Sequence, residues 1–343
     1  MMKPNLRLHN QNFSVDIQRV AGLIANTQHQ SGEIPWCEGE KTDPWDHVEA
    51  AMGLGIGGYI EEARRAYRWL AQIQLDDGSW YTAYVNGDPV DKTRDTNFSA
   101  YIAVGVFQYY LITGDTQFLK EMWPSVRSAI TFVLNLQGPG GEIFWAVCPE
   151  GKIDARALLT GSSSVYMSIK CAAATAKVLN IAVREWEAAL IRLRRALVHR
   201  PDRFDNTTSR YSMDWFYPIL SGAVTGFRAR QRIEKFWETF VIKNKGVRCV
   251  SDRPWVTVAE TCELSLALSA MGDTRLSETV FGWIHQRTNS DGSYWCGFTC
   301  PDMTVWPKDK TTWTNAAVLI AADAICEITA ACKLFSHRFW KRP

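Results

Sequence analysis

Apolar residues recur along the chain at helical spacing, in runs that glycine, proline and polar turn residues interrupt. These patterns predict twelve helices and leave almost no room for strands. The expected helices span residues 15–29, 45–56, 59–74, 96–111, 116–136, 161–179, 183–199, 214–225, 228–242, 255–271, 274–288 and 312–330.

Two kinds of helix alternate along the chain. Helices that follow long loops are rich in Ala, Gly and Ser, as in Ala50-Ala51-Met52-Gly53, and carry acidic or aromatic residues only at their N-terminal ends. Helices that precede long loops are charged on one face, as in Glu61-Glu62-Ala63-Arg64-Arg65. Small apolar helices are typically buried and amphipathic ones face water.

This alternation predicts an all-α fold, an (α/α)6 toroid of six inner and six outer helices. The inner helices begin near residues 45, 96, 161, 214, 255 and 312, a spacing typical of arrays of helical hairpins. An open solenoid of helix pairs is the competing architecture, but its loops are seldom so uneven. We expect one domain over 1–343, ending in a short, basic, solvated tail at about 333–343.

Composition excludes several classes of partner. The 38 basic and 36 acidic residues are interleaved, and the net charge of +2 predicts neither nucleic acid nor an acidic membrane as partner. The N-terminal sequence has no apolar signal-peptide core, and no stretch is apolar over the roughly 18 to 20 residues that a membrane span needs. We therefore expect a cytoplasmic protein without a transmembrane segment.

The nine cysteines fit reduced thiols better than a disulfide framework. Cys296 and Cys300 form a lone Cys-x3-Cys, and the six histidines are scattered. The sequence therefore predicts no metal site and no cofactor. The partner that we expect is a small-molecule substrate.

The chain contains 15 tryptophans, many of them in loops beside acidic residues. If the two rings alternate, the long loops surround the N-termini of the inner helices, where backbone N–H groups and helix dipoles converge. The residues expected there are Asp43, Trp45, Asp46, His47, Glu49, Arg94, Asp95, Asn97, Ser162, Ser163, Ser164, Tyr211, Asp214, Trp215, Asp252, Arg253, Trp255, Glu260, Glu263, Trp306, Lys310 and Trp313.

Carboxylates and indoles together suit two kinds of chemistry. Aromatic faces stack on sugar rings, while paired carboxylates protonate a leaving oxygen and activate water. Alternatively, aromatic faces stabilise carbocations. The candidate catalytic residues are Asp46, Asp95, Asp214 and Glu260, and the candidate substrate-binding residues are Trp45, His47, Glu49, Arg94, Asn97, Tyr211, Trp215, Asp252, Trp255, Trp306 and Trp313.

Each candidate also has a structural interpretation. Asp43, Asp95 and Asp214 can each cap a helix, whereas Asp46 follows a position that already serves as the cap. Glu260 and Glu263 can form an ion pair with Arg248 or Arg253, and His47 can be a buried structural histidine. The tryptophans 36, 80, 145 and 295 close loops and are expected to wedge neighbouring hairpins together.

Two families of α/α toroids resemble parts of this chain. The segment Gln74-Leu-Asp-Asp-Gly-Ser-Trp80 resembles the Gln-to-Trp repeat of squalene and hopene cyclases and of protein prenyltransferases, with looser echoes at 137–145 and 286–295. The acid motif Asp-x-Asp-Asp of the cyclases is absent. This resemblance implies an isoprenoid substrate.

The second resemblance is to six-hairpin glycosidases of the glucoamylase type. It is carried in order by Asp95-Thr-Asn-Phe98, Thr113-Gly-Asp115, Phe118-Leu119, Trp123-Pro124 and Gly141-Glu142. It implies glycoside hydrolysis on the same fold.

Our leading hypothesis is a carbohydrate-active enzyme that hydrolyses a glycoside through a pair of carboxylates. An isoprenoid cyclase or prenyltransferase-like enzyme, and a toroid that binds a ligand without catalysis, remain as alternatives.

Overall fold

The computed structural model describes residues 7–10 and 13–341, and helices dominate this part of the chain. Each of the twelve expected helices has a counterpart. The helices are α1 (Ile17–Thr27), α2 (Pro44–Ile56), α3 (Ile60–Ile73), α4 (Thr96–Ala100), α5 (Ile102–Thr113), α6 (Thr116–Asn135), α7 (Leu159–Val178), α8 (Arg184–His199), α9 (Ser212–Leu220), α10 (Phe227–Phe240), α11 (Val258–Met271), α12 (Thr274–Gly282) and α13 (Thr312–Cys326), with short 3-10 turns at Pro201–Arg203, Asn206–Arg210 and Phe339–Lys341.

The loops hold more strand than the sequence predicts. The strands in the described residues are β1 (Arg7–Asn10), β2 (Phe13–Asp16), β3 (Ala83–Val85), β4 (Asp88–Asp91), β5 (Arg94–Asp95), β6 (Ala146–Val147), β7 (Ile153–Asp154), β8 (Val241–Ile242), β9 (Gly246–Arg248), β10 (Trp255–Thr257) and β11 (Gly297–Thr299). They pair in short antiparallel sheets, ordered β1-β2, β3-β4, β5-β6-β7 and β11-β10-β9-β8.

Several helix boundaries differ from the expectation. The helices α9, α12 and α13 end at Leu220, Gly282 and Cys326, before the expected ends at 225, 288 and 330. The helix expected over 96–111 is interrupted at Tyr101, which separates α4 from α5. The helix expected to begin at Trp255 begins at Val258 instead, because Trp255–Thr257 pairs as a strand with both β9 and β11. Aromatic and β-branched residues favour such a strand.

The described residues form two compact units. One unit combines the chain up to Thr27 with Met52–Ile60 and the segment that starts at Ser209. The other combines Gln28–Ala51 with Glu61–Thr208. We call them the terminal unit and the middle unit; whether they make one domain stays a prediction.

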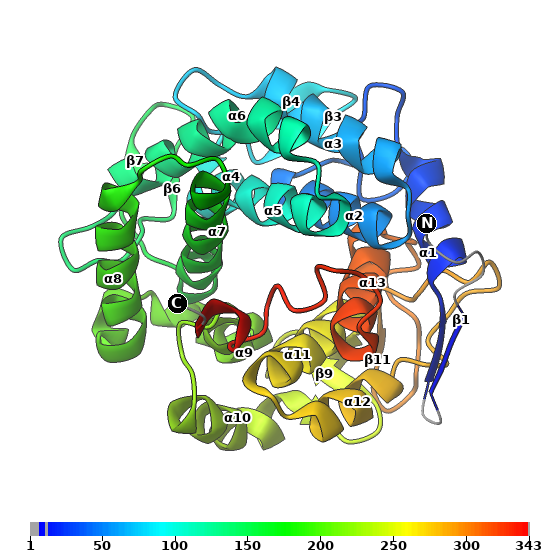
Figure 1. Cartoon of the computed structure of the whole chain (residues 1–343). Coiled ribbons are helices and arrows are strands. Elements are labelled where there is room, and N and C mark those ends of the chain that lie inside the picture. Colours follow the sequence, from blue (N-terminus) through cyan, green and yellow to red (C-terminus); the bar gives the residue numbers. More distant parts are fainter. Residues whose placement is uncertain (1–6, 11–12, 342–343) are drawn as a thin grey trace. The chain divides into compact units, whose positions relative to one another are not determined.

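In the middle unit, apolar helices pack on each other and amphipathic helices cover them (Figure 1). Helices α4 and α5 contact α7, while α6 covers α5 and α8 covers α7. In the terminal unit α11 contacts both α9 and α13, with α10 against α9 and α12 against α11. The predicted division into buried and covering helices is therefore present in each unit.

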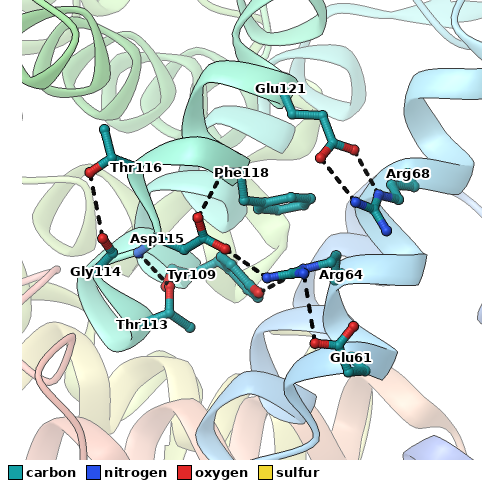
Figure 2. Close-up of polar contacts among 10 residues, drawn as sticks. All are labelled: Glu61, Arg64, Arg68, Tyr109, Thr113, Gly114, Asp115, Thr116, Phe118 and Glu121. Carbon is teal, nitrogen blue, oxygen red and sulfur yellow. Dashed lines mark hydrogen bonds and ion pairs between the residues drawn. The ribbon is translucent and has the colours of Figure 1, made fainter.

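A tight turn joins α5 to α6, and Figure 2 shows how its residues fasten α3. Gly114 adopts a left-handed conformation, and Asp115 then caps α6 by accepting a hydrogen bond from Phe118 N at 2.9 Å. The same carboxylate accepts one from Arg64 of α3 at 2.6 Å, and Arg68 pairs with Glu121 one turn further on. The Thr-Gly-Asp segment that resembles glycosidases thus orients two covering helices.

A repeated clamp fastens successive covering helices. In each copy a Gln side chain donates to the carbonyl of a Gly four residues later and to a carbonyl of the next covering helix. The copies are Gln28 with Gly32 and Glu62, Gln74 with Gly78 and Ser125, and Gln137 with Gly141 and Ala189. The Gln-to-Trp repeat is therefore a packing device in this chain, and the sequence analysis missed its copy at Gln28.

The expected solvated tail differs in its described part. Leu334, Phe335 and His337 are buried, and the His337 ring bonds to the Ile219 carbonyl at 2.7 Å. The prediction of a solvated tail is wrong for these residues, because apolar side chains alternate with the basic ones. Residues 342 and 343 lie outside the described part.

Candidate active site

The N-terminal ends of three buried helices meet in the middle unit. The Trp45 ring at the start of α2 lies 5.9 Å from the Phe98 ring of α4. A Cβ added to Gly161 of α7 would lie 3.6 Å from Asn97 Cβ. The predicted convergence of loops and helix N-termini is present within this unit.

Asp43 caps α2 and is almost completely buried. Its Oδ1 accepts a hydrogen bond from Asp46 N at 2.9 Å, and its Oδ2 accepts one from the Trp36 indole at 2.7 Å. The Asp46 carboxyl also hydrogen bonds to it. Burial raises the pKa of Asp43, and these hydrogen bonds oppose the rise.

Asp46 and its neighbours form an acidic, aromatic cluster in the first turns of α2. Asp46 is half-buried. Glu49, one turn later, is buried and accepts hydrogen bonds from the Trp45 indole at 2.9 Å and from the Tyr101 hydroxyl at 3.3 Å. Trp45 is itself half-buried, so a ring and two carboxylates share this helix end.

His47 is a structural residue, which corrects its interpretation as a substrate ligand. It is 0% exposed, its Nδ1 accepts from Ile34 N at 3.1 Å, and its Nε2 donates to the Ala66 carbonyl at 3.0 Å. Burial lowers its pKa to about 4, so the ring is neutral near pH 7. Both ring nitrogens are used, and none is left for a sugar.

Asp95 repeats the arrangement of Asp43 at the start of α4. Its Oδ1 accepts from Asn97 N at 2.7 Å and from Phe98 N at 3.1 Å, and its Oδ2 accepts from the Trp145 indole. Burial raises its pKa to about 6. The Asp95 carboxylate already accepts three hydrogen bonds, so its geometry fits the capping interpretation better than catalysis.

The other candidates of the middle unit lie close by. Arg94 pairs with Asp77 at 2.5 Å, which leaves little of its charge for a ligand. Asn97 is buried, and its Oδ1 has no hydrogen-bond partner among the described residues. The serines 162, 163 and 164 are buried in α7; two of them donate to main-chain carbonyls.

In the terminal unit, short strands gather the N-terminal ends of α9, α11 and α13. Ser212 N donates to the Cys249 carbonyl, and Val258 N donates to the Cys296 carbonyl. Hydrogen bonds from Thr311 and Thr314 reach the Cys296 side chain. The loop strands, absent from the sequence prediction, are thus what brings these helix ends together.

Glu260 stands in the first turn of α11 and is 8% exposed. Its Oε2 has no hydrogen-bond partner among the described residues. The Cys249 side chain hydrogen bonds to this carboxyl group, and burial together with the Glu260 charge raises the pKa of the Cys249 thiol. Sequence reasoning missed Cys249, because it lies in a loop eleven residues before Glu260. Glu263, half-buried one turn later, also acts on this thiol.

Asp214 and Trp215 belong to α9. Asp214 is buried, and Arg232 of α10 donates to its main-chain carbonyl at 2.6 Å. Trp215 is 2% exposed, donates its indole N–H to the Arg232 carbonyl at 2.8 Å and stacks on Phe240. Trp215 is therefore a core residue, which corrects its interpretation as a substrate ligand.

Two tryptophans, the half-buried Trp255 of β10 and the exposed Trp306, form a platform in the terminal unit. The Trp255 and Trp306 rings meet edge to face with centroids 5.3 Å apart, and the Trp255 indole donates to the Trp306 carbonyl at 2.7 Å. Trp306 is 59% exposed. Tyr211, Asp252 and Arg253 are exposed as well, but Asp252 is paired with Arg210.

Lys310 is paired with Asp291 at 2.6 Å, and Trp313 is half-buried in the first turn of α13. In the part of the chain that the structure describes, no group of three or more His, Cys, Asp or Glu side chains could hold a metal ion. Among the same residues no helix is both long enough and apolar enough to cross a membrane.

Known proteins share this fold. The mannosylglycerate hydrolase of family GH63 from Thermus thermophilus, solved with glucose, matches 88% of this chain and 98% of its own with a TM-score of 0.68 at 12% identity. A D-mannose isomerase matches with a TM-score of 0.70 at 10% identity, over 91% of this chain and 96% of its own. These similarities define the class: an all-α toroid, as the sequence predicts.

Sequence comparison goes further. No family model matches the chain. The MMP endo-(1,4)-3-O-methyl-α-D-mannosidase of Mycolicibacterium hassiacum is 48% identical over 318 residues, which are 93% of this chain and 88% of that enzyme. The chain belongs to the family of this mannosidase and is a glycoside hydrolase. The glycosidase interpretation is confirmed, and the isoprenoid alternative gains no support.

Proposed function

We propose that this glycoside hydrolase cleaves internal (1,4) bonds of a 3-O-methyl-α-D-mannoside chain, and that Glu260 of the terminal unit and Asp46 of the middle unit are each the strongest candidate in their unit for a catalytic carboxylate. The substrate follows from the activity named for the 48%-identical relative. The two carboxylates are chosen from the four candidates by the surroundings of each.

The observation that carries this proposal is that Glu260 is buried with one carboxylate oxygen lacking a hydrogen-bond partner among the described residues. A buried carboxylate oxygen without a partner is costly, so such a group is retained where a ligand or reacting atom completes its hydrogen bonds. Glu260 Oε2 is such an atom, at the positive end of α11. The expected structural pair of Glu260 with Arg248 or Arg253 is not among the ion pairs of the described residues.

Asp46 is preferred over Asp95 because the two occupy different positions in similar caps. Asp43 and Asp95 both serve as the capping residue, and each binds main-chain N–H groups and an indole. Asp46 follows its cap by three residues and is half-buried. Asp214 stays a weaker candidate, since Arg232 lies against it and attracts its charge.

Glycoside hydrolysis needs one carboxylic acid that protonates the leaving oxygen and one carboxylate that activates water or attacks the anomeric carbon. Aromatic side chains with exposed faces suit the sugar rings on either side of the broken bond. We assign this binding role to Trp306, Trp255 and Trp45, with Glu49, Arg94, Asn97, Tyr211, Asp252 and Trp313 as further candidates for hydroxyl contacts. The nine free thiols support a reducing, cytoplasmic location.

The test is hydrolysis of an α-(1,4)-linked 3-O-methylmannose oligosaccharide, followed by product length and new reducing ends. Glu260→Gln and Asp46→Asn should each lower kcat by about 10²–10⁴-fold, the usual contribution of an acid or base. Asp273→Asn is the matched control, because Asp273 caps α12 and asparagine caps equally well. Wild-type rates in both Glu260→Gln and Asp46→Asn would overturn the assignment.

A further inference from the structure

We propose that Asn97 of α4 and Gly161 of α7 form a subsite for one sugar ring in the middle unit, in which Asn97 Oδ1 accepts a hydrogen bond from a ring hydroxyl. This inference rests on the proposed function. It makes Asn97 a specificity-determining residue, which selects the hydroxyl groups that the enzyme recognises and takes no part in proton transfer.

The Asn97 side chain is buried without the hydrogen bond that its oxygen requires. Asn97 is 3% exposed, and its Oδ1 has no hydrogen-bond partner among the described residues. Its main chain is used by the helix, since its N–H donates to Asp95 Oδ1 at 2.7 Å and its carbonyl accepts from Tyr101 N at 3.1 Å. A buried amide oxygen without a donor costs folding free energy, so the fold gains nothing from this oxygen. A ligand hydroxyl would supply the missing donor.

A second buried asparagine shows how a structural asparagine differs. Asn315 stands near the start of α13 and is 2% exposed. Its Oδ1 accepts from Tyr294 N at 3.0 Å, and its Nδ2 donates to the Thr311 carbonyl at 3.1 Å. Both ends of that amide are satisfied by the protein, whereas the oxygen of Asn97 is not.

The start of α7 leaves room beside Asn97. Gly161 is half-buried, and the side-chain atoms that an added Cβ would meet within 4 Å are Asn97 Cβ at 3.6 Å and Leu158 Cβ at 3.8 Å. No side chain caps α7, and the first N–H groups of a helix have no acceptor within it. Gly161 therefore leaves accessible space next to Asn97, at a helix end that offers main-chain donors.

Aromatic side chains suited to a sugar ring adjoin this subsite. Phe98, the residue after Asn97, meets the Trp45 ring with centroids 5.9 Å apart, and Trp45 meets the Tyr101 ring at 5.6 Å. Trp45 is half-buried and directly precedes Asp46 in α2. The Asn97 subsite and the catalytic candidate of the middle unit thus lie at helix ends that contact each other.

A hydroxyl group is the ligand that these atoms fit. Its hydrogen can donate to the Asn97 oxygen, and its oxygen can accept from a main-chain N–H of α7. In an interior ring of a (1,4)-linked 3-O-methylmannose chain, the oxygens at C1, C3 and C4 each join two carbons and cannot donate. Only the hydroxyls at C2 and C6 remain, so we expect Asn97 to bind one of these two and not the methylated oxygen.

The test measures KM and kcat on the 3-O-methylmannose oligosaccharide, together with the melting temperature. Asn97→Leu removes the acceptor and keeps about the same side-chain size. It should raise KM about 3- to 10-fold, the usual contribution of one hydrogen bond, with little change in kcat. Its melting temperature should not fall, because an unpaired buried oxygen is removed. Asn315→Leu is the matched control, which should lower the melting temperature and leave KM unchanged.

Gly161→Ala tests the space beside Asn97. Alanine favours a helix over glycine, and its methyl group would meet the protein at ordinary contact distances, so the melting temperature should stay the same or rise. The methyl group would occupy the place of the sugar ring, and KM should rise about tenfold or more. The 2-deoxy and 6-deoxy forms of the oligosaccharide identify the hydroxyl, since Asn97→Leu should cause no further loss on the form that lacks it.

Wild-type KM in either Asn97→Leu or Gly161→Ala would overturn the inference. An equal loss in Asn97→Leu on the parent oligosaccharide and on both deoxy forms would also overturn it. A failure of the proposed function gives a different result: the wild-type protein would not cleave the oligosaccharide, or both Glu260→Gln and Asp46→Asn would cleave it at the wild-type rate.

Discussion

Gln74 and Ser125 are joined by a hydrogen bond of 3.0 Å between the Gln74 Nε2 and the Ser125 carbonyl of α6. The same amide nitrogen donates to the Gly78 carbonyl at 2.8 Å, so one side chain ties its own loop to the next covering helix. This relationship recurs at Gln28 and Gln137, so the repeat has a packing role in this chain that requires no isoprenoid substrate.

Gln74→Leu should lower the free energy of unfolding by about 1–3 kcal/mol, because two carbonyls lose their donor. Chemical denaturation of the purified protein measures it. Gln30→Leu serves as the control, since Gln30 is exposed, and it should change stability by less than about 0.5 kcal/mol. Equal effects of the two substitutions would show that the clamp carries no stability.

Gly78→Ala should destabilise the protein more than Gly114→Ala. Both glycines have positive φ, +91° and +69°, so both variants carry the strain of about 1–2 kcal/mol of a left-handed residue. A Cβ on Gly78 would lie 2.3 Å from the Ser128 carbonyl oxygen, whereas a Cβ on Gly114 meets nothing within 4 Å. The melting temperatures of the two variants separate the backbone strain, which both share, from the steric clash with Ser128, which only Gly78→Ala has. Similar melting temperatures would contradict this clash.

The lowered pKa of His47 predicts that the folded protein loses stability in acid. Its pKa of about 4 in the folded protein lies below the usual 6.5, so the unfolded chain binds the proton more readily. The stability that the neutral ring contributes is complete above pH 6.5 and falls by up to about 1.4 kcal/mol per pH unit as the pH drops toward 4.

The measurement is the difference in unfolding free energy between the wild type and His47→Gln at pH 7.5 and pH 5. The difference should shrink at pH 5, because only the wild type pays the protonation penalty. A difference that does not change with pH would mean that the pKa of His47 is the same in the folded and the unfolded protein.

Trp306→Ala should raise KM on the oligosaccharide about tenfold, which corresponds to about 1.4 kcal/mol, with little change in kcat. Its ring is exposed and has no proton to transfer in the cleavage, so we expect it to contribute to uniform binding. Phe227→Ala, which removes another exposed ring of the same unit, is the control and should leave KM unchanged. Unchanged KM in Trp306→Ala would remove the platform from the binding site.

The sequence predicts the fold better than the site. Amphipathic periodicity and breakers locate each helix, because a helix buries one face over many residues and the pattern repeats. The strand at Trp255–Thr257 escaped prediction, since three residues carry no period and one of its two pairing partners, Gly297–Thr299, is about 40 residues away in the chain. His47 and Trp215 looked like ligands because a residue's place in the first turn does not reveal whether the next helix covers it.

Partner choice at the site is likewise set by tertiary structure. The paths of the loops bring Trp36 to Asp43 and Cys249 to Glu260. No regular spacing in the sequence indicates these contacts. The carboxylate at a helix start is visible in the sequence, but its role depends on what else donates to it. Asp43 and Asp95 are both caps that bind an indole, whereas Asp46 stands just after its cap, although all three are carboxylates at a helix start.

The Gln clamps also affect local unfolding of the protein. Each one binds the loop that leaves a helix to the next covering helix, so a single hairpin cannot detach without releasing its neighbour. Local opening should therefore involve at least two hairpins at once, and the amide protons of α3, α6 and α8 should exchange with solvent at similar rates. The loops held by these clamps should therefore stay ordered until two neighbouring hairpins open together.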